Sequence, residues 1–172
     1  MSRSKTATAT PDDLRRQLQL LKLPFILEHF EELAQKAGSQ QWSHVEFLAR
    51  LIEGEAALRQ DHACQRRIKN ARFPVLKTLQ QFDFTWPAKI NRLQVQNLFR
   101  LKFIEDKANA IFIGGVGLGK THAAIALGLA ACQAGIRVRF ATAIDIINGL
   151  SAAQNAGLLA KELRQYSRPE LL

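Results

Sequence analysis

A glycine-rich stretch in the second half of the chain has the residue types and spacing to hold phosphate groups. Residues 114–121 match the pattern G-x-x-x-x-G-K-[ST]. Glycines let consecutive backbone N–H groups turn inward, and a following helix adds the positive end of its dipole. We predict a nucleotide site in which Lys120 reaches the β- and γ-phosphates and the Thr121 hydroxyl holds Mg²⁺. The alternative is a turn without function, which the flanking segments argue against. The predicted binding residues are Gly114, Gly115, Val116, Gly117, Leu118, Gly119, Lys120 and Thr121.

The segments around this stretch predict the elements that would position it. The apolar run at residues 110–113 is typical of a buried strand, and the Ala- and Leu-rich run at 121–134 predicts a helix that ends at Gly135. Residues 136–141 predict a second strand, so the order is strand, phosphate loop, helix, strand. The expected fold class is α/β, with an N-terminal helical domain followed by a partial P-loop domain built on a parallel sheet.

The N-terminal half of the chain predicts helices. Thr10, Pro11 and two following acids form a helix start, and a second apolar stripe after Pro24 is expected to end at Gly38. Ser43 to Glu46 predicts a capping box for a long third helix. We expect a disordered tail at residues 1–9, a helical domain at 10–88, and an incomplete P-loop domain at 89–172.

The charge balance predicts a phosphate-rich partner. The net charge is +9 and the sequence pI is near 10.1, which favours nucleic acid over an anionic membrane surface. A solvated basic surface is the alternative. Arg66, Arg67, Lys69 and Arg72 crowd the end of the long helix, where each cation that meets a DNA phosphate adds affinity without sequence specificity. Interaction with the helix dipole explains the same placement about equally well.

The cysteines and the hydropathy of the sequence argue against a disulfide-bonded, a metal-binding and a membrane-spanning protein. Cys64 and Cys132 fit no C-x-x-C pattern, so neither a metal site nor a disulfide is expected. No apolar run is long enough to cross a bilayer, and the N-terminus lacks the apolar region of a secretory signal. We therefore expect a cytoplasmic protein without a membrane partner.

Three aromatic residues lie between the basic cluster and the glycine-rich stretch. Phe82, Phe84 and Trp86 alternate with polar residues. We expect them to pin a linker onto a core, with a base-stacking platform as the alternative.

Four segments of the chain carry a resemblance to a known family. Residues 114–128 resemble the phosphate loop and its flank in IstB-like ATP-binding proteins, and residues 66–74, 103–105 and 135–140 are similar as well. These proteins are helper ATPases of one class of bacterial insertion sequences, with an AAA+ core similar to the DnaC helicase loader. The resemblance implies a module that binds ATP, assembles on DNA as a homo-oligomer and works with a transposase. A DnaC-type helicase loader and a non-catalytic DNA-binding module with a vestigial loop are the alternatives.

The sequence departs from that family's pattern at the residues that would activate water for ATP hydrolysis. There, the segment matching residues 168–172 begins the strand that carries the paired acids of Walker B, and this sequence stops at Leu172. Asp145, Glu162 and Glu170 offer no substitute, and an arginine finger and sensor residues are absent. We therefore assign no catalytic residue and predict ATP binding without hydrolysis. We expect either a second polypeptide that completes the domain or a truncated product whose strands have unpaired edges.

Overall fold

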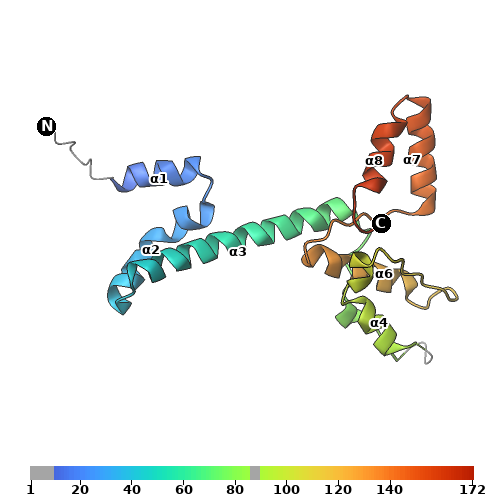
Figure 1. Ribbon diagram of the computed structural model, residues 1–172, viewed down its shortest axis with the longest axis horizontal. Helices are drawn as coiled ribbons and strands as arrows, with labels where there is room; N and C mark the ends of the chain where they lie inside the picture. Colours follow the sequence, from blue (N-terminus) through green and yellow to red (C-terminus); the bar gives the residue numbers. More distant parts are fainter. Residues whose placement is uncertain (1–9, 86–89) are drawn as a thin grey trace. The chain divides into compact units, whose positions relative to one another are not determined.

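The computed structural model describes residues 10–85 and 90–172, which fold into two compact units divided at His62 and Ala63 (Figure 1). The long helix α3 (His44–Ala71) contributes residues to both units. The predicted tail at residues 1–9 lies outside the described residues, and so does the predicted domain boundary at 88/89. Both therefore remain predictions.

The first unit contains helices α1 (Pro11–Leu20), α2 (Pro24–Gln40) and the first part of α3. The predicted start of α1 is confirmed, because the Thr10 side chain accepts a hydrogen bond from the Asp13 N–H at 3.2 Å. Leu18, Ile26 and Leu51 are buried together, one from each helix. Leu27, Phe30 and Leu33 of α2, which recur at helical spacing, pack against these three residues, so an apolar stripe of α2 faces the shared core.

A buried carboxylate joins α2 to α3 within the first unit. Glu55 is 4% exposed, and its side chain accepts hydrogen bonds from the Phe25 N–H at 2.9 Å and from Arg59 Nε at 3.1 Å. It caps the start of α2, whose own N-cap residue makes no side-chain hydrogen bond. The far end of α2 differs from the prediction: the helix passes Gly38 and ends at Gln40, and Gln41 adopts a left-handed conformation with φ of 53°.

The second unit is arranged around helix α6 (Lys120–Gln133). This helix is apolar on all sides and is buried along most of its length, as expected of a helix with neighbours all round. Its Ala131 and Cys132 pack with Ala71 and Val138 in the core of the unit. The remaining elements are η1 (Leu79–Gln81), α4 (Arg92–Leu98), α5 (Lys102–Glu105), α7 (Ala143–Asn155) and α8 (Leu159–Ser167).

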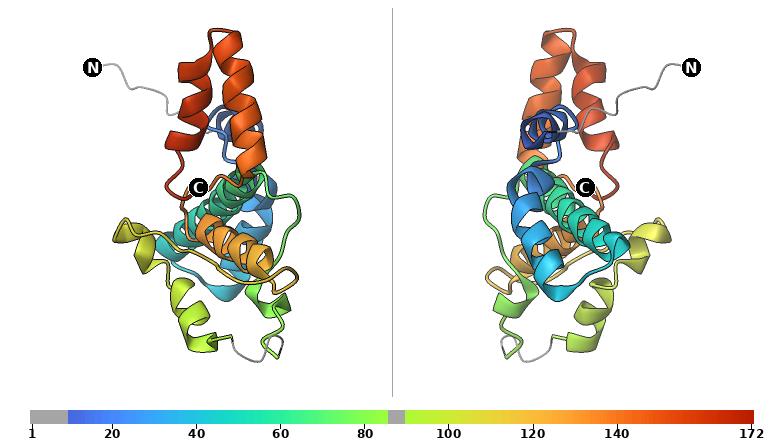
Figure 2. Two further views of the ribbon diagram at one scale, coloured as in Figure 1. Left: turned by 90° about the vertical axis from the view of Figure 1, so that its right-hand side faces the viewer. Right: turned by 90° about the vertical axis from the view of Figure 1, so that its left-hand side faces the viewer.

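Helices α7 and α8 lie side by side as an antiparallel pair (Figure 2). Thr142 starts α7 with a capping box, since its hydroxyl accepts from the Asp145 N–H at 3.1 Å while the Asp145 carboxylate accepts from the Thr142 N–H. Helix α7 ends at Asn155 and α8 begins at Leu159, so a short turn joins the two helices.

The predicted α/β fold class is wrong. Residues 10–85 and 90–172 contain helices and no strand, and the pairing of Val138 with Leu171 is an isolated parallel bridge. The expected strand at 110–113 forms no backbone hydrogen bond with the described residues, and Ile111 and Ile113 are 80% and 91% exposed. An extended segment becomes a strand only when a neighbouring backbone satisfies its N–H and C=O groups, and no such neighbour lies beside these residues.

Cys64 and Cys132 are free thiols, and burial raises the pKa of Cys132. No helix in the described part of the chain combines the length and apolar character needed to cross a bilayer.

Candidate functional site

The glycine-rich loop turns directly into α6 through two residues in the left-handed conformation. Gly117 has φ of 80°, and Gly119, the N-cap of α6, has φ of 77°. Residues with a Cβ rarely adopt these angles, so the two glycines allow the sharp turn that leads the chain into the helix. Gly119, a fixed position of the motif, is thus also required by the backbone conformation, and so is Gly117 at one of the variable positions.

The backbone N–H groups of the loop are available to a ligand. Within the described residues, none of the N–H groups of residues 114–122 donates to a backbone carbonyl, and the first such bond of α6 runs from Ala123 to Gly119 at 2.9 Å. No side chain caps this helix end either. Unpaired N–H groups at the positive end of a helix dipole form an anion site.

The two polar side chains of the motif lie at this helix start. Lys120 Nζ donates a hydrogen bond to the Gly115 carbonyl, so the ammonium group links the end of the loop to its beginning. The Thr121 side chain is exposed and lines a cavity of about 610 Å³ together with Thr142, Asp145 and other residues. The loop therefore presents the two side chains that the sequence predicts for phosphate and Mg²⁺.

The aromatic ring of Phe82 packs against the glycine-rich loop. Phe82 is 8% exposed and packs against Gly119, where an added Cβ would lie 2.8 Å from its ring. Its ring also lies edge-on to His122, with centroids 5.3 Å apart, and the His122 ring contacts the Thr78 carbonyl at 2.9 Å. The predicted pinning role is confirmed for Phe82, whereas Trp86 lies outside the described residues.

The acids near the loop are engaged in local structure. Asp145 accepts from the Thr142 hydroxyl at 2.6 Å, and this bond lowers the pKa of Asp145. The Glu162 carboxylate accepts a hydrogen bond from the Gln165 side-chain amide. No group of three or more metal-binding side chains occurs among the described residues. These acids therefore form no carboxylate cage for a metal ion in the described part of the chain.

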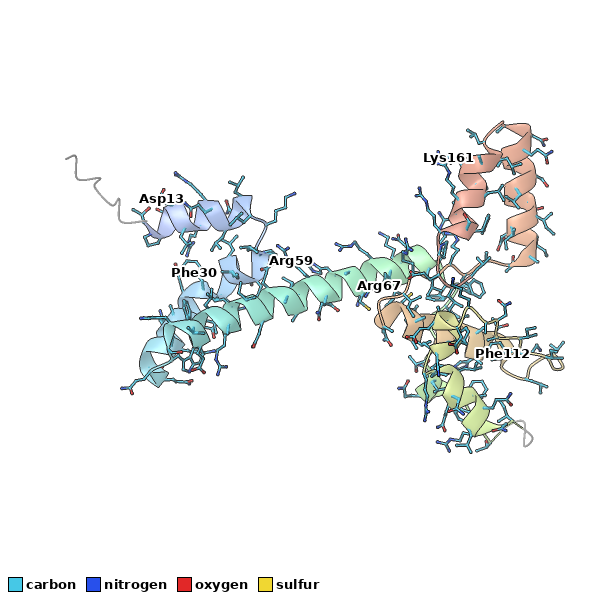
Figure 3. The ribbon with its side chains drawn as sticks, in the orientation of Figure 1. Asp13, Phe30, Arg59, Arg67, Phe112 and Lys161 are labelled. Atoms are coloured by element: carbon cyan, nitrogen blue, oxygen red, sulfur yellow. The ribbon has the colours of Figure 1, made fainter. Side chains whose placement is uncertain are left out.

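The four predicted DNA-contacting residues lie near one another in the second unit. Lys69, Arg72 and Arg67 line one cavity of about 640 Å³, and Arg66 lines an adjoining hollow of about 600 Å³ that shares Arg67. Arg67 also has a structural role, because its Nε donates to the Cys132 carbonyl at 2.8 Å near the end of α6 (Figure 3). Arg67 therefore uses one of its donors in a hydrogen bond within the unit.

Four further cations, which were not among the predicted site residues, line the same cavity: Arg137, Arg139, Arg164 and Arg168. Two signals could have found them. Arg137 and Arg139 are two positions apart in a segment outside the helices, and Arg164 and Arg168 are four positions apart at the end of α8, so each pair shares a side of its segment.

The family model described as IstB-like ATP binding protein matches residues 16–172. The insertion sequence IS5376 ATP-binding protein of Geobacillus stearothermophilus is 38% identical over 152 residues, which is 88% of this chain and 61% of the relative. The insertion sequence IS21 ATP-binding protein of Pseudomonas aeruginosa is 38% identical over 93% of this chain and 60% of the relative. The corresponding IS232 protein of Bacillus thuringiensis subsp. berliner is 30% identical over 92% of this chain. The chain thus spans 60–64% of the length of these relatives.

Proposed function

This chain belongs to the family of IstB-like ATP binding proteins, and on that premise we propose that it binds ATP through residues 114–121 in support of insertion-sequence transposition. One observation carries the proposal: the start of α6 has no side-chain cap, and the N–H groups of residues 114–122 have no backbone acceptor within the described chain. A triphosphate supplies the acceptors that this helix start lacks.

Lys120 changes partners when the nucleotide binds. Its ammonium group donates to the Gly115 carbonyl in the free loop, and a phosphate oxygen is a stronger, charged acceptor for the same group. The Thr121 hydroxyl, which is exposed beside Lys120, then contributes one ligand to the Mg²⁺ that accompanies the phosphates.

Titration of the full chain with a fluorescent ATP analogue tests the site. Lys120→Ala should weaken binding by at least tenfold because the loop then lacks its only ammonium group, whereas Lys102→Ala, which removes a lysine outside the loop, should have no effect. Thr121→Ala should remove only the Mg²⁺-dependent part of the affinity. Equal binding by the native chain and Lys120→Ala, or no binding by the native chain, would refute the ATP site.

We expect this chain to bind ATP without hydrolysing it. A water-activating carboxylate would have to reach the γ-phosphate, but Asp145 caps α7 and Glu170 pairs with Arg137 at 2.9 Å. Phosphate release by the purified chain should equal the buffer background. Turnover that disappears in Lys120→Ala would contradict this expectation.

The second part of the proposal is sequence-independent DNA binding through Arg66, Arg67, Lys69 and Arg72. Three of these cations lie in the last turns of α3 and Arg72 directly follows it, and no ion pair within 4.0 Å involves any of the four in the described residues. Cations that are not held in an ion pair can contact DNA phosphates and release their counterions. Affinity should therefore fall steeply with salt and should weaken in Arg66→Gln.

The transposase partner and the homo-oligomer are proposals that rest on the family. Co-purification of the tagged chain with the transposase of its element would support the first, and capture of a replicative helicase instead would favour a helicase loader. DNA binding that persists unchanged in Lys120→Ala and ignores ATP would favour a non-catalytic DNA-binding module. Light scattering with and without ATP and DNA measures the oligomer.

A further inference from the structure

We infer that the cation-lined cavity of the second unit is a binding site for the phosphodiester backbone of nucleic acid, formed jointly by the end of α3, the segment around Arg137 and Arg139, and the end of α8. This inference rests on the proposed DNA binding and deepens it, because it adds two segments that the basic cluster of α3 does not contain. The cavity has a volume of about 640 Å³, which exceeds the needs of a single small anion.

The charge of the cavity is strongly one-sided. Seven of its lining side chains are cationic and none is acidic. Arg137 alone has an ion-pair partner, Glu170, among the described residues. Like charges held this close repel one another, so a polyanion is the occupant that the site fits.

Arg139 supplies an observation that is independent of the net charge. Its Nε atom is buried and has no hydrogen-bond partner among the described residues, and the residue lines this cavity as well as the cavity that contains Thr121. A buried N–H group without an acceptor is uncommon in folded proteins, and a phosphate oxygen in the cavity is an acceptor for it.

The shape of the cationic surface favours a chain of phosphates over a compact anion. The adjoining hollow of about 600 Å³ adds Arg66, shares Arg67 and Arg137 with the main cavity, and contains one acid, Glu170, which is paired with Arg137. A backbone with regularly spaced phosphates can follow both hollows, as in other grooves that bind nucleic acid through its backbone.

Helix α8 offers a matched pair of side chains for the test. Arg164 lines the cavity, whereas Lys161, one turn earlier on the same helix, does not (Figure 3). Both are exposed, so replacing either with glutamine removes one positive charge without disturbing a buried contact.

The experiment measures fluorescence anisotropy of labelled duplex and single-stranded oligonucleotides against the full chain over a range of salt concentrations. Arg164→Gln should reduce the slope of log affinity against log salt by about 0.9 for duplex and about 0.7 for single strands, and raise the Kd roughly fivefold to tenfold at 0.1 M salt. Lys161→Gln should leave the slope unchanged and alter the Kd less than twofold. Arg164→Lys should retain the slope, and circular dichroism verifies that each variant is folded.

The outcomes separate this inference from the proposed function. If Arg66→Gln weakens binding while Arg164→Gln behaves like Lys161→Gln, the cavity site is overturned and DNA binding by α3 stands. If the native chain binds neither oligonucleotide, the DNA-binding proposal and the cavity site both fall. A loss in Arg164→Gln that Arg164→Lys restores supports the cavity site.

Discussion

Replacing Gly119 with alanine tests whether the phosphate loop depends on the aromatic residue behind it. Two costs add at this position. A residue with a Cβ loses about 1–2 kcal/mol in the left-handed conformation that Gly119 adopts at φ of 77°. The new Cβ would also lie 2.8 Å from Phe82, and overpacking of a buried ring costs about 1–3 kcal/mol.

Gly117 is the matched control for the conformational cost. Its φ of 80° is nearly the same, but no atom lies within 4 Å of an added Cβ. Gly117→Ala should therefore show only the first cost, and Gly119→Ala should be less stable than Gly117→Ala by about 1–3 kcal/mol. Phe82 cannot simply move away, because it is 8% exposed and packs against Phe84 with ring centroids 4.9 Å apart.

Labelling of a buried thiol measures the difference within the second unit. Cys132 is fully buried in α6, so a thiol reagent reacts with it when this part of the unit opens. In a Cys64→Ser background, Gly119→Ala should react about fivefold to a hundredfold faster than Gly117→Ala, since 1.4 kcal/mol corresponds to a factor of ten. Adding Phe82→Leu should remove most of that difference. Equal labelling rates in the two alanine variants would refute the predicted contact between Phe82 and the loop.

Two predictions concern other contacts. Gly38→Ala should stabilise the protein by about 0.5–1 kcal/mol, because Gly38 is helical and no atom lies within 4 Å of an added Cβ. Gly54→Ala should destabilise the protein by about 1–3 kcal/mol, because the added Cβ would overlap the Phe25 ring. Urea unfolding followed by circular dichroism compares the two variants, and a stabilised Gly54→Ala would contradict the packing of Phe25 against Gly54. The Arg137 side chain, by hydrogen bonding, lowers the pKa of Glu170, so this pair stabilises the fold at pH values above the usual glutamate pKa and is lost as the pH falls through the lowered value. Thermal melts should show Glu170→Gln less stable than the native chain above about pH 5, with the gap shrinking as the pH falls below the usual glutamate pKa, and a gap that is constant with pH would refute the assignment.

Helix starts could be predicted from the sequence because their contacts are short-range. Thr10 and Asn91 each accept a hydrogen bond from a backbone N–H three residues later, as their residue types and neighbours indicate. The predicted start of α6 at Thr121 is correct to within one residue, since α6 begins at Lys120 after the left-handed glycine. These features need only a window of a few residues.

The sheet could not be predicted in the same way, because a strand requires a partner elsewhere in the chain. Residues 110–113 have the apolar character of a buried strand, but no backbone of the described residues pairs with them. The end of α2 also differs from its local signal, since Gln41 rather than Gly38 takes the left-handed position. Local pattern alone does not determine long-range pairing.

The sequence by itself determined the glycine-rich motif and the family, because both are encoded in contiguous residues such as Gly119, Lys120 and Thr121. Only the tertiary structure decided which cations share a cavity. Lys69 and Arg164 are far apart along the chain, and the sequence carries no sign that they line one space. The physical reason is that a binding motif can be encoded within one turn of backbone, whereas a charged cavity depends on how distant segments pack.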